Sequence, residues 1–359
     1  MSLLFSETTL GPLKLQNRLL MCPLTRNRAT DNIPNALMAE YYAQRATVGL
    51  IITEGTSPSP NGLGYPRIPG MFSPAQVAGW RHITEAVHAR GAKMFVQLMH
   101  CGRIAHALNL PAGARLLAPS AVAAAGEMYT DAEGLKPHPV PQAMDEADIK
   151  ASIAEYAQAA KNAVSAGFDG IELHSANGYL LEQFIRPNSN QRTDAYGGSI
   201  ENRARFVLEV ADAAIDAIGK DRVGIRLSPF GVFNDVPLYE AMEADYTYLA
   251  QQLNARELIY IHLVDHSSQG APPVPDSMKA TFRKIFKRSL ILSGGYDAAR
   301  AENDLVAGKC DLIAVGKPIL ANPDLLTRWE TGAALNEPDM ATFYTPGPEG
   351  YTDYPALNG

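Results

Sequence analysis

The feature of this sequence that most constrains its fold is a regular alternation of short apolar runs with longer helical patterns. Parallel strands joined by helical crossovers produce such an alternation. The runs with the length and apolar, β-branched character of buried strands are eight in number: residues 18–24, 50–53, 93–99, 170–174, 223–228, 258–264, 290–293 and 312–315. The helical patterns that follow them cover residues 36–47, 74–90, 146–166, 200–218, 239–254, 276–287, 298–307 and 323–332.

Eight strand–helix pairs predict a closed (β/α)8 barrel of the α/β class, a TIM barrel, with its active site at the carboxyl ends of the strands. The pattern over residues 146–166 is typical: Ile149, Ile153 and Tyr156 fall on one helical face, and Asp145 is a suitable N-cap. A doubly wound open sheet is the structural alternative. No G-x-G-x-x-G motif opens a helix after a predicted strand, which disfavours that alternative.

Two segments lie outside the repeat. The first dozen residues resemble a short hairpin that would plug the floor of the barrel. Residues 101–144 form a long excursion after the third strand, rich in alanine, proline and glycine. A connection of this length on a regular barrel usually serves as a lid or a binding element. We therefore expect one domain over residues 1–359, with residues 101–144 as a lid-like part of it.

Charge and composition exclude several classes of protein. The net charge is −7, and the densest basic cluster, residues 279–288, reads as the solvated side of an amphipathic helix, so no nucleic-acid partner is expected. The start of the chain has no charged, apolar leader, and no run approaches the ~20 apolar residues of a membrane span, which favours a cytoplasmic location. The scattered Cys22, Cys101 and Cys310 predict buried thiols and no disulfide, zinc or iron–sulfur site.

If the barrel is right, polar and small residues at the strand ends meet in one shallow bowl. They are Thr25, Gly55, Gln97, His174, Asn177, Tyr179, Arg226, Gly294, Gly295, Gly316 and Lys317. The set holds planar hydrogen-bond donors, one phenol and two small-residue turns where barrels often bind phosphate. It contains no carboxylate pair and no mid-barrel lysine, which disfavours glycosidase and Schiff-base chemistry.

Each of these residues also has a plain structural interpretation. A lone histidine at a strand end is more often hydrogen-bonded structure than a catalyst, and Tyr179 alone would more often be packing. His174 gains weight because Asn177 and Tyr179 follow it closely, and a charged Arg226 in a barrel strand needs an anionic partner. His262 and His266 resemble a metal pair but have no third ligand at suitable spacing, so we expect no metal.

Several longer motifs carry a resemblance. The most specific are H-S-A-N-G-Y-L-L-E-Q-F at residues 174–184 and T-D-A-Y-G-G-S-I-E-N-R-A-R-F at residues 193–206. Shorter matches lie at residues 17–26, 51–55, 96–98, 226–229, 321–325 and 350–355. Through these motifs the chain resembles the Old Yellow Enzyme family over nearly its whole length.

The resemblance implies a tightly but non-covalently bound FMN. Flavin contacts are then expected from Pro23, Leu24, Thr25, Gly55, Gln97 and Arg226, with Gln97 and Arg226 at the pyrimidine edge. The FMN phosphate would lie against Gly294, Gly295, Gly316 and Lys317. His174 and Asn177 would bind the carbonyl or nitro oxygen of a substrate whose pocket also includes Tyr65, Met99, Phe233 and Tyr344.

The implied activity is that of an NAD(P)H-dependent ene-reductase. NAD(P)H would reduce the flavin and leave, and hydride would pass from flavin N5 to the β-carbon of an activated alkene. Tyr179 would protonate the α-carbon from the other face, and sharing of one pocket predicts ping-pong kinetics. The family includes monomers and homodimers, and no apolar stripe in this sequence decides between them.

Two departures from the family pattern affect these expectations. Lys317 stands where arginine is usual and loses the bidentate fork, and Met99 stands where many relatives carry tryptophan, which predicts a roomier pocket. Residues 267–274 do not match, so no contact is transferred there.

Three other functions stay open. Nitrate-ester or nitroaromatic reduction would use the same scaffold, whereas a dienoyl-CoA-reductase-like enzyme would need an iron–sulfur cluster for which this sequence lacks the cysteines. A non-catalytic flavin-binding redox sensor has no need of a proton donor such as Tyr179.

Overall fold

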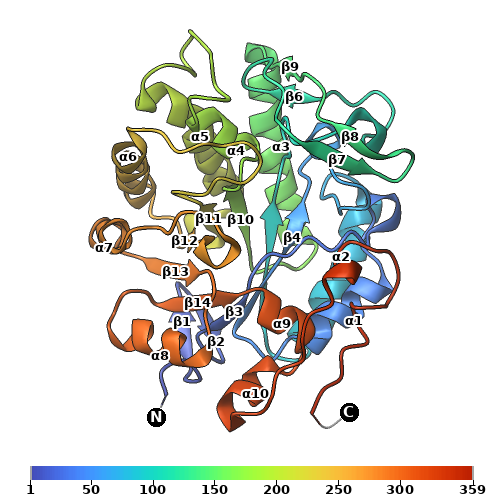
Figure 1. The fold of residues 1–359 in the computed structure, drawn as a ribbon, viewed down its shortest axis with the longest axis vertical. Coiled ribbons are helices and arrows are strands. Elements are labelled where there is room, and N and C mark those ends of the chain that lie inside the picture. Colours follow the sequence, from blue (N-terminus) through green and yellow to red (C-terminus); the bar gives the residue numbers. More distant parts are fainter. Residues whose placement is uncertain (1, 358–359) are drawn as a thin grey trace.

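The computed structural model describes residues 2–357, and its centre is a closed eight-stranded barrel (Figure 1). All neighbouring barrel strands pair in parallel. In barrel order they are β3 (Leu19–Met21), β4 (Leu50–Thr56), β5 (Lys93–Leu98), β10 (Gly170–Ser175), β11 (Val223–Leu227), β12 (Tyr260–Val264), β13 (Ser289–Ser293) and β14 (Leu312–Val315). The TIM barrel prediction is confirmed, and the open sheet is excluded.

Helices surround the barrel (Figure 1). They are α1 (Ala36–Gln44), α2 (Pro74–His88), α3 (Glu146–Ser165), α4 (Leu180–Ile185), α5 (Ile200–Ile218), α6 (Met242–Ala255), α7 (Asp276–Ile285), α8 (Ala298–Val306), α9 (Lys317–Ala321) and α10 (Leu325–Thr331). Asp145 caps α3 as predicted, and its partner in a capping box is Asp148. Within residues 2–357, none of these helices combines the length and the apolar character that a bilayer crossing requires.

Several predicted element boundaries need correction: the second strand continues to Thr56 and not to residue 53, and α1 ends at Gln44 and not at residue 47. The first strand is only Leu19–Met21, because Pro23 has no N–H to continue the ladder. The sixth begins at Tyr260 and not at residue 258, and α6 begins at Met242 and not at residue 239. After the last strand the chain forms α9 as well as α10, since Pro318 fits the first turn of a helix. The short α4 was not predicted.

The N-terminal hairpin closes one end of the barrel. Its strands β1 (Thr8–Leu10) and β2 (Leu13–Leu15) pair antiparallel. Leu10 and Leu15 are buried in one apolar cluster with inward residues of the barrel strands, among them Ile52 and Phe95. Burial of these leucines on the barrel floor is the physical reason that the plug forms, and it leaves the carboxyl ends of the strands as the open end.

The excursion at residues 101–144 carries two small sheets. Strand β6 (Leu117–Ala118) pairs with β9 (Gln142–Ala143), and β7 (Glu127–Thr130) forms a hairpin with β8 (Gly134–Pro137). Met128 of β7 is buried in a cluster against Tyr65 and Tyr179. The hairpin therefore packs against Tyr65 and Tyr179, two of the residues that the sequence places in the candidate site. The short 3-10 turns of the chain are Thr30–Asn32, Pro60–Gly62, Ala107–Asn109, Lys220–Arg222, Ser267–Gln269 and Met340–Thr342.

Candidate active site

A cavity of about 1170 Å³ opens at the carboxyl ends of the barrel strands. Its volume suits a ligand larger than an ordinary small substrate. It is lined by thirteen of the residues predicted from the sequence: Pro23, Leu24, Thr25, Tyr65, Asn177, Tyr179, Arg226, Phe233, Gly294, Gly295, Gly316, Lys317 and Tyr344. The structure thus brings together side chains that span most of the sequence.

Four predicted residues are not among the lining residues: Gly55, Gln97, Met99 and His174. A side chain at Gly55 would collide with Met99, because a Cβ there would lie 2.4 Å from the Met99 sulfur. Met99 itself is 1% exposed and packs in an apolar cluster beside Tyr65 and Tyr179. Gln97 and His174 are buried just as deeply, at 2% and 3% exposure.

The turn that carries Asn177 and Tyr179 is held rigidly by its backbone. Asn177 has a φ of 58° and Gly178 a φ of 77°, a conformation that needs support at a non-glycine residue. The Asn177 N–H donates to Ser228 Oγ at 2.8 Å, and the Gly178 N–H donates to Glu182 at 2.7 Å.

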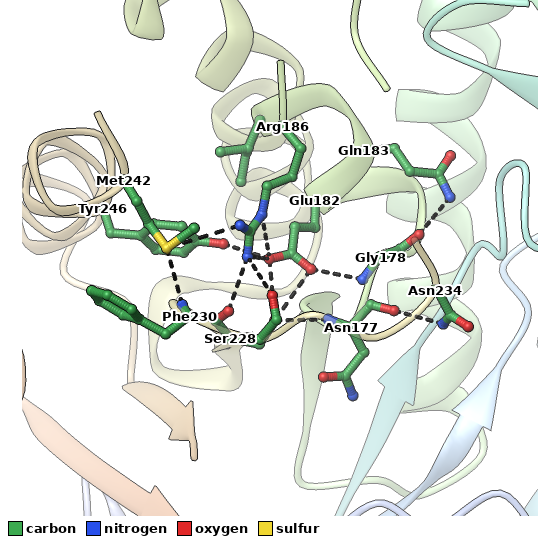
Figure 2. Close-up of polar contacts among 12 residues, drawn as sticks. Asn177, Gly178, Glu182, Gln183, Arg186, Ser228, Phe230, Asn234, Met242 and Tyr246 are labelled. Carbon is green, nitrogen blue, oxygen red and sulfur yellow. Dashed lines mark hydrogen bonds and ion pairs between the residues drawn. The ribbon is translucent and has the colours of Figure 1, made fainter. Parts of the chain in front are cut away.

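The two carbonyls of this turn are bound as well. The Asn234 side chain donates to the Asn177 carbonyl and the Gln183 side chain to the Gly178 carbonyl, each at 2.7 Å (Figure 2). All four polar backbone groups of residues 177–178 therefore have hydrogen-bond partners. These bonds fix the backbone positions from which the Asn177 and Tyr179 side chains extend.

A fully buried ion pair holds this turn through a hydrogen bond from the Gly178 N–H. Glu182 and Arg186 lie four residues apart around the end of α4, both side chains are 0% exposed, and Arg186 Nη2 lies 2.7 Å from Glu182 Oε1. Ser228 and Tyr246 also donate to Glu182, Tyr246 at 2.5 Å (Figure 2). The sequence motif contains Glu182, but its role as the centre of this network was not predicted.

Tyr179 has the properties of a proton donor. Its hydroxyl lies 3.0 Å from the Tyr65 hydroxyl, and burial raises its pKa above the ordinary value, so that the phenol stays protonated. The His174 ring packs edge-on against the Tyr179 ring at 4.8 Å. Burial, together with the charge of Arg226, holds the pKa of His174 well below its ordinary value. His174 is therefore a neutral hydrogen-bonding group and not a second acid.

A polar network crosses the barrel beside the cavity. Gln97 donates to Glu172 at 2.7 Å, and Glu172 lies 2.9 Å from His262 Nδ1. Burial alone would raise the pKa of Glu172, but His262, Arg226 and Gln97 outweigh burial and lower it. Arg226 pairs in register with His174 on one side and His262 on the other. Its Nε is buried with no partner in residues 2–357, so it can donate to a ligand in the cavity.

The far part of the cavity has the form of a phosphate cradle. Gly294 has a φ of 124°, and a Cβ there would lie 1.9 Å from the Asp265 carbonyl oxygen, so only glycine fits. Gly295 follows it, and Gly316 and Lys317 line the neighbouring wall. Lys317 and the glycine turn can bind a phosphate group through charge and backbone N–H donors. The free Nε–H of Arg226 can donate to the electron-rich edge of a ring. The residues present therefore fit FMN.

Sequence reasoning missed several residues of the cavity. Glu127, Tyr129 and Leu135 of the β7–β8 hairpin line it, as do Ser268 and Gln269, from the segment where no contact was transferred. No sequence signal identifies them: the position of the three hairpin residues depends on how the excursion folds back, and Ser268 and Gln269 belong to a short 3-10 turn after β12.

His262 and His266 have separate hydrogen-bond partners, so their side chains are not arranged as a metal-binding pair. His262 lies between Glu172 and Ser293, and His266 contacts Asn177. The part of the chain that the structure describes contains no group of three or more metal-ligating side chains. The cysteines Cys22, Cys101 and Cys310 are buried free thiols, as predicted.

Glu54 gives a prediction on stability. This buried carboxyl accepts hydrogen bonds from the Arg26 N–H and the Tyr42 hydroxyl, and burial raises its pKa from 4.5 to about 7. The folded state therefore holds a proton that the unfolded state releases, so this contribution to stability is present near pH 5 and is lost as the pH rises through 7. The expected loss is about 2–3 kcal/mol.

Denaturant unfolding followed by tryptophan fluorescence at pH 5 and pH 8 measures this effect. The Glu54→Gln variant keeps an acceptor for the Arg26 N–H and can donate its NH2 to the Tyr42 hydroxyl, but it has no proton to exchange. Its free energy of unfolding should change less between the two pH values, by about the same 2–3 kcal/mol. An identical pH dependence in both proteins would contradict the prediction.

The chain is similar over nearly its whole length to known reductases. The model of the NADH:flavin oxidoreductase / NADH oxidase family matches residues 3–336. Chanoclavine-I aldehyde reductase of Penicillium roqueforti is 43% identical, with 99% of this chain and 96% of that protein covered. A probable flavin mononucleotide-dependent alkene reductase of Leishmania infantum is 42% identical, with 97% and 95% covered. Morphinone reductase in complex with tetrahydroNAD matches with a TM-score of 0.93 at 45% identity, over 99% of this chain and 97% of that one.

Proposed function

The chain belongs to the NADH:flavin oxidoreductase / NADH oxidase family, which includes the Old Yellow Enzymes, and from this premise we propose that it is an ene-reductase for α,β-unsaturated carbonyl compounds or nitroalkenes. Like its relatives it is an FMN-dependent oxidoreductase that uses a reduced nicotinamide. FMN, when bound, would supply the hydride chemistry between NAD(P)H and the β-carbon of the alkene.

The protein's own residues would bind and polarise the substrate. The amide of Asn177 and the neutral imidazole of His174 are two donors for the substrate oxygen, and they draw electron density from the double bond. Tyr179 would add a proton to the α-carbon from its hydroxyl. Arg226 from the cavity lining and Gln97 from the polar network beside it would hold the ring edge of the cofactor, while Gly294, Gly295 and Lys317 would hold its phosphate.

One observation carries this proposal. The Tyr179 phenol is kept protonated by burial, is hydrogen-bonded to Tyr65, and lines the same cavity as Asn177. A protein that only bound flavin would have no use for a proton donor next to an oxygen-binding amide. The excursion hairpin over this region would exclude water from the reaction.

An anaerobic titration tests the proposal. The purified yellow protein is bleached with NADPH, and 2-cyclohexenone is then added while the visible spectrum is recorded. Return of the colour at a stoichiometric amount of enone supports ene-reduction. Return of the colour only with nitro compounds or nitrate esters would favour that alternative activity, and a protein that is never reoxidised by any of these would sink the proposal.

Met99 leads to a prediction on substrate range. Its side chain fills the space that Gly55 leaves and packs near Tyr65 and Tyr179. In a Met99→Trp variant the larger indole would press on these two tyrosines and narrow the pocket. We expect kcat/KM for bulky enones to fall by about 10-fold or more, with a change in product enantiomer ratio.

Gas chromatography on a chiral phase with several enones checks this expectation, and Met99→Leu, which keeps the volume, is the control. Unchanged enantiomer ratios for all bulky enones with Met99→Trp would contradict it.

A further inference from the structure

His266 lies just after β12, and within residues 2–357 its side chain makes one polar contact, to the side chain of Asn177. Its Nε2 lies 2.7 Å from Asn177 Oδ1, and both residues line the cavity. The imidazole is 8% exposed, and its ring lies 4.6 Å from the ring of Phe233. These contacts give the imidazole a fixed place between the pocket wall and the amide.

The contact has a direction. An amide oxygen only accepts hydrogen bonds, so Nε2 must carry the proton. The opposite amide orientation would require Nε2 to accept and Nδ1 to carry the proton. Nδ1 of His266 is buried without a partner in the described chain, and an unpaired buried N–H is tolerated less than an unpaired acceptor. The orientation with Oδ1 facing His266 is therefore the favoured one.

The charge state of His266 agrees with this assignment. Burial, with the nearby charge of Arg226, lowers its pKa to about 4, so the ring is neutral and has a single N–H. The adjacent Asp265 is paired with Lys279 at 2.9 Å, which leaves its carboxylate occupied. His266 is thus a neutral donor with one acceptor, the amide oxygen of Asn177.

We propose that His266 is a positioning residue that fixes the polarity of the Asn177 amide, so that its amino group and not its carbonyl oxygen faces the substrate. This inference rests on the proposed function, in which Asn177 binds the substrate oxygen. The Asn177 amino group has no protein partner in residues 2–357, so it is free to donate into the cavity. Without His266, the Asn177 amide would populate both orientations. In one of them its Oδ1 would face the substrate oxygen, and no hydrogen bond could form between the two acceptors.

The test measures binding of 2-cyclohexenone to the oxidised holoenzyme, without turnover, from the perturbation of the flavin absorbance. His266→Gln retains a donor and should bind the enone within about twofold of the wild type. His266→Leu removes the donor and should bind about fivefold more weakly. His266→Glu, measured at pH 9 so that its carboxyl is ionised, supplies only an acceptor, reverses the amide and should bind about tenfold more weakly or worse.

Two controls separate this effect from charge and from misfolding. Ser267→Glu places the same charge on the exposed neighbour outside the cavity lining, and it should leave the dissociation constant unchanged. Retained FMN and an unchanged flavin spectrum show that each variant has folded. Equal weakening by Ser267→Glu and His266→Glu would mean that charge and not amide orientation is responsible, and would overturn the proposal.

A double-mutant cycle distinguishes a failure of this inference from a failure of the proposed function. In an Asn177→Ala background, His266→Leu should cause no further weakening, because its effect passes through the amide. If Asn177→Ala alone leaves enone binding unchanged, the proposed substrate-binding role of Asn177 is wrong. If Asn177→Ala weakens binding but the two substitutions add independently, or His266→Leu alone has no effect, the role assigned to His266 is wrong.

Discussion

Replacement of Tyr179 by phenylalanine is expected to slow the reaction of the reduced enzyme with 2-cyclohexenone by about 100- to 10,000-fold, the usual contribution of a positioned general acid. The substitution removes one hydroxyl, whose partner is Tyr65 at 3.0 Å, and leaves the ring that packs against His174. Reduction of the enzyme by NADPH involves no proton from this residue and should keep its rate within a few-fold. Anaerobic stopped-flow absorbance resolves the two half-reactions.

The same variant has an internal control in its choice of oxidant. Reoxidation by molecular oxygen needs no proton on carbon, so it should be as fast in Tyr179→Phe as in the wild type. Tyr65→Phe removes the hydrogen-bond partner but not the donor and should have a smaller effect on the enone reaction. If Tyr179→Phe reduced the enone at close to the wild-type rate, the proton would have to come from another group or from water.

The pH dependence of this step follows from the raised pKa. An acid must be protonated to act, and burial keeps the Tyr179 phenol protonated well above pH 7. The enone half-reaction of the wild type should therefore show no loss of rate between pH 6 and pH 9 that is due to this residue. His174 also stays neutral over this range, because its pKa is shifted downward.

The barrel was predictable from the sequence because its signal is repeated. Each strand is an apolar run buried on both faces, and each long crossover has its own helical period, so errors at single boundaries do not change the topology. The gathering of the candidate site residues was predictable for a related reason: the carboxyl ends of parallel strands meet, so Asn177, Arg226 and Lys317 had to lie near one another. Family motifs then suggested a role for each.

Features that depend on contacts across the chain were not predictable. Helix α4 is six residues long and buried on every side, so it has no polar face and no helical period to detect. The contact of His266 with Asn177 joins residues 89 positions apart, and no local pattern encodes it. The packing of Met99 against the tyrosines follows from the missing side chain of Gly55 on the adjacent strand.

The ion pair beneath the catalytic turn gives the largest expected effect on stability. In Arg186→Met the carboxylate of Glu182 keeps the hydrogen bonds from Gly178, Ser228 and Tyr246 but loses the one cation that pairs with it within residues 2–357. An unpaired buried charge of this kind costs about 3–5 kcal/mol. The double variant Glu182→Gln/Arg186→Met removes both charges and keeps an acceptor for the Gly178 N–H.

The double variant should therefore be more stable than Arg186→Met alone, although it has lost more native contacts. Urea unfolding of the three proteins gives the free energies directly, and enone binding by the folded variants reports on the turn itself. Residue 182 accepts the hydrogen bond from the Gly178 N–H. In both Arg186→Met and the double variant, we expect residues 177–178 to keep their conformation only if this hydrogen bond is still formed. If Arg186→Met unfolded within about 1 kcal/mol of the wild type, the pair would be a weak contributor to stability. If enone binding were also unchanged, the bonds of Ser228 and Asn234 would suffice to hold the conformation of Asn177.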